Sequence, residues 1–162
     1  MNAGLMHKQW PQRGLLRISP HDSATLISKQ AGADFTMDSL SGLICVVDDD
    51  DAVRDSLGIL LMARGLNVRT FESARAFLED GAANSCSCLL LDMHMPEMTG
   101  LALLLELRRS GKAVAAIMIT GAGDAILGKV AKEAGALAVL HKPVREDELF
   151  GWIERALGSK TD

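Results

Sequence analysis

The sequence predicts an α/β protein built on a five-stranded, doubly wound parallel sheet. Five apolar runs recur along the chain, and each is followed by a turn, an amphipathic segment and a glycine. The runs lie at residues 43–47, 66–71, 88–91, 116–119 and 137–140. We interpret them as strands covered on both faces, which right-handed crossovers through helices produce.

Helical periodicity supports the segments between the runs. Two sets of residues recur at intervals of three and four residues, such as i, i+4, i+7, i+8, which is the spacing of one helix face. The set after residues 43–47 is Val53, Leu57, Leu60, Leu61 and Arg64. The set after residues 88–91 is Leu101, Leu104, Leu105 and Arg108.

Capping residues predict where the helices begin and end. An N-cap side chain accepts a hydrogen bond from the first turn, and glycine suits the left-handed position that ends a helix. The predicted N-caps are Asp50, Ser73, Thr99 and Asp124. The predicted closing glycines are Gly65, Gly81, Gly111, Gly135 and Gly158.

Composition narrows the class of protein. A formal net charge of -4 over 162 residues gives no reason to expect nucleic-acid binding, which needs a basic face. We find no apolar run near the ~20 residues of a membrane span, and no signal peptide. The three cysteines do not suggest disulfides or zinc; Cys86 and Cys88 are expected on one face of a strand, packed inside. These features favour a cytoplasmic protein.

Residues 1–40 lack the sustained periodicity of the rest of the chain. They are predicted to be a flexible N-terminal extension, with a short helix near residues 24–30. The domain proper is expected at residues 41–162. Met37 is an alternative first residue, in which case residues 1–36 do not belong to the native protein.

Chemically distinctive residues follow four of the five runs. Asp48 and Asp49 follow the first, Asp92 the third, Thr120 the fourth and Lys142 the fifth. In a doubly wound sheet the carboxyl ends of the strands form the site. An aspartate there can accept a phosphoryl group, an acidic cluster can bind Mg²⁺, and a lysine can pair with the product. Taken singly, each motif also fits a helix cap or a turn.

Together these motifs resemble the receiver domain of bacterial two-component response regulators, over about residues 41–158. The matching text is Val46-Val47-Asp48-Asp49, residues 91–100, Ile119-Thr120-Gly121, Ala134-Gly135-Ala136 and Lys142-Pro143. The segments at residues 71–74 and 120–124 are most similar to the nitrogen-fixation regulator subgroup.

The resemblance implies a flavodoxin-like sheet of order 2-1-3-4-5 with five helices. It implies that Asp92 is the phosphoacceptor and that Thr120 and Lys142 are the switch residues. Asp48, Asp49, Asp92 and the backbone carbonyl of His94 are the implied Mg²⁺ ligands, and a cis Lys142-Pro143 bond is expected. The implied donor is a sensor histidine kinase or a phosphotransfer protein. Such a domain phosphorylates and dephosphorylates itself rather than turning over a substrate.

Three features depart from the family pattern. Val139 stands where the family often has a rotating aromatic. His94 and His141 are uncommon near the site, and we interpret them as polar side chains on the surface with no role in the site. The sequence ends at Asp162, so a stand-alone receiver without an output domain is expected. Its signal would then leave through the fourth helix, fifth strand and fifth helix, by partner binding or as a homodimer. The residues expected to be exposed on that face are Lys129, Lys132, Glu133, Arg145, Glu148 and Trp152.

Other functions remain open from the sequence. A haloacid-dehalogenase-like phosphohydrolase would use Asp48 and Asp50 but leaves Asp92 unexplained. A receiver fragment of a longer DNA-binding regulator and a pseudo-receiver that is never phosphorylated are two further alternatives.

Overall fold

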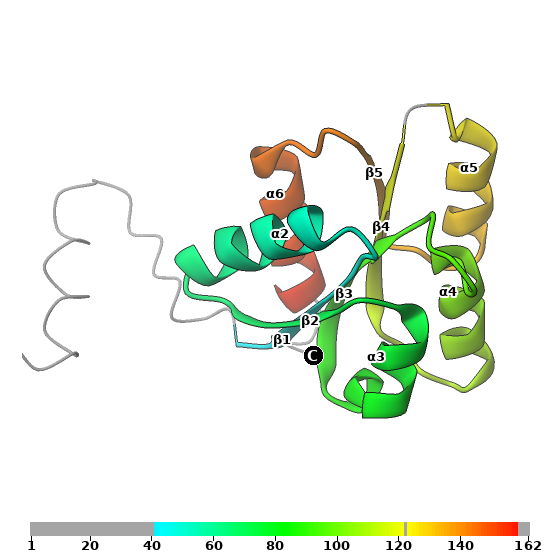
Figure 1. Ribbon diagram of the computed structural model, residues 1–162, viewed down its shortest axis with the longest axis horizontal. Coiled ribbons are helices and arrows are strands. Elements are labelled where there is room, and N and C mark those ends of the chain that lie inside the picture. The colour runs from blue at the N-terminus through cyan, green and yellow to red at the C-terminus, as the bar shows by residue number, and fades with distance from the viewer. Residues whose placement is uncertain (1–40, 122, 159–162) are drawn as a thin grey trace, which may run out of the picture. The chain divides into compact units, whose positions relative to one another are not determined.

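The computed structural model describes residues 41–121 and 123–158, and this part of the chain forms one parallel sheet. The strand order is β2-β1-β3-β4-β5, as predicted (Figure 1). The strands are β1 (Leu43–Val47), β2 (Asn67–Phe71), β3 (Cys86–Asp92), β4 (Ala115–Thr120) and β5 (Ala138–His141). The reversal of strand order beside β1 opens the carboxyl edge between β1 and β3.

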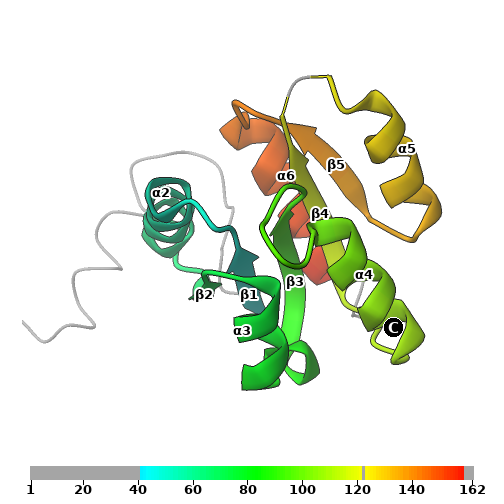
Figure 2. The same cartoon turned by 45° about the vertical axis from the view of Figure 1, so that its right-hand side comes forward.

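Five α-helices cover the sheet in the described residues, which confirms the predicted number. They are α2 (Asp51–Ala63), α3 (Ala74–Asp80), α4 (Gly100–Arg109), α5 (Ala125–Glu133) and α6 (Glu146–Gly158), with a short 3-10 turn at Ala82–Asn84. Figure 2 shows α2 and α6 on one face and α3, α4 and α5 on the other. Each face has its own apolar core, so the sheet is the middle of three layers.

Most of the predicted helix ends are confirmed. The side chains of Asp50, Ser73 and Thr99 accept hydrogen bonds from the first turns of α2, α3 and α4. The glycines after α2, α3, α4 and α5 have the positive φ that ends a helix, namely Gly65, Gly81, Gly111 and Gly135. Gly158 is the last residue of α6.

The predicted cap at Asp124 is wrong. Asp124 stands at the N-cap position of α5, but its side chain makes no capping bond. Its carboxylate instead accepts hydrogen bonds from two side chains of the site.

The expectation that every strand is covered on both faces is wrong for β2. This strand lies at the sheet edge, and Asn67, Arg69 and Thr70 are exposed. By contrast, all seven residues of β3 are buried, as expected for the central strand. Asp92 therefore ends the most enclosed strand of the sheet.

Cys86 and Cys88 are both buried, but they do not share a face as predicted. Cys86 packs in the core under α3 and α4, and Cys88 in the core under α2 and α6. The cause is a register shift, in which Leu43 and Ile44 pair with Cys86 and Cys88 and Ser87 becomes an extra residue. Such a bulge interrupts the alternation of side chains along the strand.

The predictions for residues 1–40, including the helix near residues 24–30 and the alternative start at Met37, lie outside the described residues. Among the helices that are described, none has the length and apolar character needed to cross a membrane.

Candidate functional site

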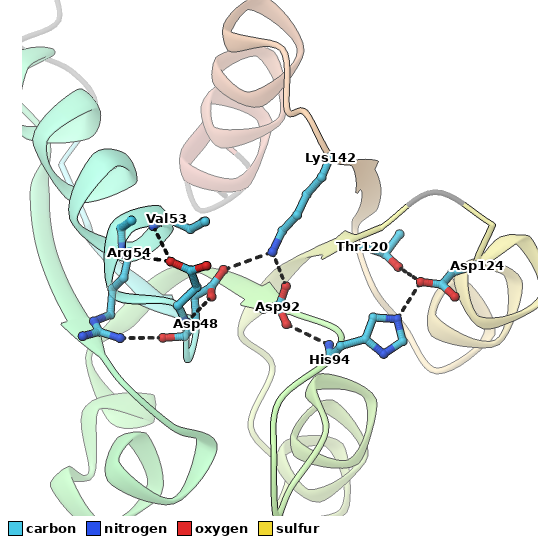
Figure 3. A network of polar contacts seen from close by, with 10 residues as sticks. Asp48, Val53, Arg54, Asp92, His94, Thr120, Asp124 and Lys142 are labelled. Atoms are coloured by element: carbon cyan, nitrogen blue, oxygen red, sulfur yellow. Dashed lines mark hydrogen bonds and ion pairs between the residues drawn. The ribbon is translucent and has the colours of Figure 1, made fainter.

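The carboxyl edge of the sheet brings the predicted site residues together. Asp48 and Asp49 follow β1, Asp92 ends β3 and Thr120 ends β4. Lys142 follows β5 and extends back toward Asp92 (Figure 3). Strand pairing brings these residues close together, because β1 and β4 both lie beside β3.

Three carboxylates form an acidic cluster. One oxygen each from Asp48, Asp49 and Asp92 lies within 4.8 Å of the others. Asp48 and Asp92 are only 2% and 4% exposed, whereas Asp49 is exposed to solvent. Like charges this close repel, and the repulsion grows with burial. A bound cation would relieve this repulsion. The carboxylates are hard oxygen donors of the kind that a small divalent cation prefers.

Lys142 supplies the positive charge that faces this cluster. Its Nζ lies 2.7 Å from Asp92 Oδ1 and 3.5 Å from Asp48 Oδ2. Partial burial pulls the pKa of the Lys142 ammonium down, but the hydrogen bond to Asp92 and the charges of Asp92 and Asp48 outweigh it and raise the pKa. Lys142 therefore stays protonated at neutral pH. The Lys142-Pro143 peptide bond is cis, as expected.

The backbone after β3 holds the other oxygen of Asp92. The His94 N–H donates to Asp92 Oδ2 over 2.8 Å, so both carboxylate oxygens have donors. The Gly100 N–H donates to the Met93 carbonyl over 3.1 Å, which brings the start of α4 against the end of β3. A Cβ at Gly100 would lie 2.1 Å from the Asp92 carbonyl oxygen, so only glycine fits there.

Asp48 is positioned by the loop before α2. Its Oδ1 accepts from the Asp50 N–H over 2.9 Å, and its backbone carbonyl accepts from Arg54 Nη1 over 2.8 Å. Arg54 also pairs with Asp51. Arg54 was not predicted to belong to the site. The available signal in the sequence was its place three residues after Asp51, on one face of the first turns of α2.

Burial raises the pKa of Asp48, and the charge of Asp92 adds to the rise, against the opposing effects of the Asp50 N–H and Lys142. The unfolded chain has an aspartate pKa of about 3.9. Because the folded state binds this proton more tightly, the free energy of unfolding falls as the pH rises from that value through the folded-state pKa.

Replacing Asp48 with asparagine is expected to remove this loss. The amide oxygen can still accept from the Asp50 N–H, while the charge is absent. In the absence of divalent cations, the free energy of unfolding of Asp48→Asn should increasingly exceed that of the wild type from about pH 4 to pH 7. Urea denaturation at several pH values measures the difference, with the exposed Asp55→Asn as control. A gap that narrows as the pH rises would contradict the account.

Thr120 belongs to a second set of contacts. It is fully buried, and its hydroxyl donates to Asp124 Oδ2 over 2.5 Å. His94 Nε2 lies 2.6 Å from the same oxygen. Figure 3 shows this chain of Thr120, Asp124 and His94 beside the Asp92–Lys142 pair. The hydrogen bonds from Thr120 and His94 hold the pKa of Asp124 below its usual range.

His94 and His141 were both interpreted as polar surface residues without a role in the site, and the structure supports this only for His141. The His141 side chain is exposed. The His94 ring is also exposed, yet it contacts Asp124 and its backbone N–H contacts Asp92. The contact between His94 and Asp124 was not predicted from the sequence, because thirty residues separate the two partners.

A doubly wound sheet with an acidic cluster, a central aspartate and a facing lysine at its carboxyl edge is the arrangement expected of a receiver domain. Residues 44–154 match the model of the response regulator receiver domain. The chain therefore belongs to the response regulator receiver family, as the resemblance predicted.

Relatives and solved structures agree with this assignment. The response regulator protein TmoT of Ectopseudomonas mendocina is 42% identical over 75% of this chain and 55% of its own length. The transcriptional regulatory protein FixJ of Azorhizobium caulinodans is 40% identical over 72% of this chain and 56% of its own length. The crystal structure of FixJ-N superposes with a TM-score of 0.70 at 33% identity, over 75% of this chain and 98% of that one.

The similarity to the nitrogen-fixation regulators is thus real, and TmoT is similar to a like degree. The chain spans about half the length of these curated relatives. The expectation of a stand-alone receiver therefore stays a prediction.

Proposed function

We propose that this domain accepts a phosphoryl group on Asp92 from a phosphohistidine of a sensor histidine kinase or phosphotransfer protein. The observation that carries the proposal is the placement of Asp92. Its carboxylate is almost fully buried at the end of the central strand, in the acidic cluster and 2.7 Å from Lys142. A structural ion pair alone would not need two further carboxylates at the same point.

The residues divide the work as follows. An Asp92 oxygen attacks phosphorus, the bond from phosphorus to the donor nitrogen breaks, and its electron pair stays on that imidazole. Lys142 stabilises the negative charge of the transferred group, which carries roughly -2 at neutral pH. Thr120 supplies a hydroxyl donor to a phosphoryl oxygen. The product is a signalling state of the domain rather than a released compound.

The site fits Mg²⁺ by the chemistry of its donors. The carboxylates of Asp48, Asp49 and Asp92 are the side chains that would hold it. The resemblance to the receiver family adds the backbone carbonyl of His94. When bound, Mg²⁺ screens the repulsion between the carboxylates and the incoming phosphoryl group.

The phosphohydrolase alternative loses its support. It requires Asp50 as an acid in the site, but the Asp50 carboxylate caps α2 through the N–H groups of Ala52 and Val53.

The pseudo-receiver alternative is decided by experiment. The full chain is incubated with acetyl phosphate and Mg²⁺, and its intact mass is measured. We expect a gain of one phosphoryl group that EDTA prevents; a mass that never changes would favour the pseudo-receiver.

An apolar hollow beside Lys142 is where we place the donor protein. It has a volume of about 440 Å³ and lies between α2 and the segment after β5. Its apolar lining comes from Ala52, Val53, Leu57, Ile119, Pro143 and Val144. Contact there would bring a donor imidazole close to Lys142 and, through it, to Asp92.

The outgoing signal is proposed to use the face formed by α5, β5 and α6. The exposed charged residues of this face are Lys129, Lys132, Glu133, Arg145 and Glu148. Trp152, expected to be exposed, is half-buried and stacks with Arg155 at 4.6 Å. Val139 is also half-buried and has no ring to rotate. A charged face of this kind suits a reversible partner or homodimer contact.

Amide hydrogen exchange with and without beryllofluoride, a phosphoryl mimic, tests the output face. We expect changed exchange in α5, β5 and the start of α6, corresponding to a coupling of about 1–3 kcal/mol. Changes restricted to α2 and residues 1–40 would exclude this face as the route of the signal.

A further inference from the structure

The Thr120 hydroxyl has one proton and therefore can donate to only one acceptor at a time. In this structure that acceptor is Asp124 Oδ2, at 2.5 Å. A phosphoryl group on Asp92 would be a competing acceptor for the same proton. The two arrangements of Thr120 exclude each other, so whatever stabilises the first opposes the second.

His94 fixes the position of the Asp124 carboxylate in the first arrangement. An ionised carboxylate only accepts hydrogen bonds, so His94 Nε2 carries the proton of its 2.6 Å contact with Asp124 Oδ2. The backbone N–H of His94 meanwhile donates to Asp92 Oδ2. One residue thus connects the acceptor of the Thr120 hydroxyl to the carboxylate that would be phosphorylated.

We propose that Asp124 is a positioning residue that, together with His94, holds the Thr120 hydroxyl away from Asp92 until a phosphoryl group competes for it. This inference rests on the proposed function. It adds a contact, that of Asp124 with the Thr120 hydroxyl, which opposes the movement of the hydroxyl toward a phosphoryl group on Asp92. Charge-assisted hydrogen bonds to a carboxylate are stronger than bonds between neutral groups, so the hold is substantial.

The position of Asp124 links this exchange to α5. Asp124 precedes Ala125, the first residue of α5, yet its side chain caps no backbone N–H there. Once Thr120 leaves, the carboxylate is free to accept from the first turn of α5, where an aspartate is a favourable cap. Phosphorylation at Asp92 would then change the start of a helix in the proposed output face, without a rotating aromatic.

Asp124→Ala tests the proposal through the affinity for beryllofluoride in the presence of Mg²⁺, measured calorimetrically on the full chain. We expect binding to tighten by about 5-fold or more, because the competing acceptor is gone. In a Thr120→Val background the same substitution should change the affinity by less than about 2-fold, since no hydroxyl remains to be released. Equal tightening in both backgrounds would mean that only the charge of Asp124 matters, and would overturn the proposal.

A second measurement does not depend on the folding of Thr120→Val. The methyl resonance of Thr120 is followed by NMR in Asp124→Ala without beryllofluoride. It should move toward its position in the beryllofluoride-bound wild type; an unmoved resonance contradicts the hold. Unchanged affinity of Asp124→Ala with normal binding by the wild type overturns this inference alone. A wild type that binds no beryllofluoride overturns the proposed function and the inference with it.

Discussion

Asp92→Asn is expected to lose all phosphoryl uptake from acetyl phosphate. The amide that replaces the carboxylate is a poor nucleophile and cannot form the acyl phosphate. Its oxygen can still accept from Lys142, and one negative charge leaves a buried cluster, so the variant should remain folded. Intact mass after incubation with Mg²⁺ gives the result directly.

Asp55→Asn is the matched control for this substitution, because Asp55 is an exposed aspartate of α2. It should take up the phosphoryl group as the wild type does. Persistent uptake by Asp92→Asn would show that another residue is the acceptor and would remove the assignment of Asp92.

Among the substitutions considered, Gly100→Ala is expected to lower the free energy of unfolding the most. The added Cβ would lie 2.1 Å from the Asp92 carbonyl oxygen and 3.1 Å from Leu91 Cγ, both in the packed end of β3. Backbone cannot yield as a side-chain tip does, so α4 must shift away from the strand. We expect the free energy of unfolding to fall by about 3 kcal/mol, measured by urea denaturation.

Gly151→Ala provides the opposite expectation within the same fold. Gly151 lies inside α6, and a Cβ there meets no atom within 4 Å. Alanine is a better helix former than glycine, so this variant should gain about 0.5–1 kcal/mol. Similar losses in both variants would mean that the contact with Asp92 is not what requires glycine at position 100.

The fold could be predicted because its signals are local. Unbroken apolar runs, capping residues and closing glycines each depend on neighbours in the sequence. The strand order 2-1-3-4-5 came from the resemblance to the receiver family, because right-handed crossovers alone are compatible with more than one order. The failures at β2 and at Cys86 have another cause. Edge position and the extra residue Ser87 depend on how strands pair, which the sequence of one strand does not contain.

The residues of the candidate site also fall into those that the sequence could predict and those that it could not. Asp48, Asp92 and Lys142 were found because each follows an apolar run, and strand pairing then brings them together. The contacts of Asp124 could not be found, because its helix-start position supports a cap equally well. Which donor its carboxylate accepts depends on the distance to Thr120 and His94, a property of the folded loops.

Chemical identification of the phosphorylated residue tests the central claim most directly. The wild type is phosphorylated with acetyl phosphate and Mg²⁺, and the acyl phosphate is reduced with borohydride, which converts the modified aspartate to homoserine. Peptide mass analysis then locates the change. We expect homoserine at position 92 and at no other aspartate. Reduction at another carboxylate, or a phosphoryl group on a hydroxyl or imidazole side chain, would contradict it.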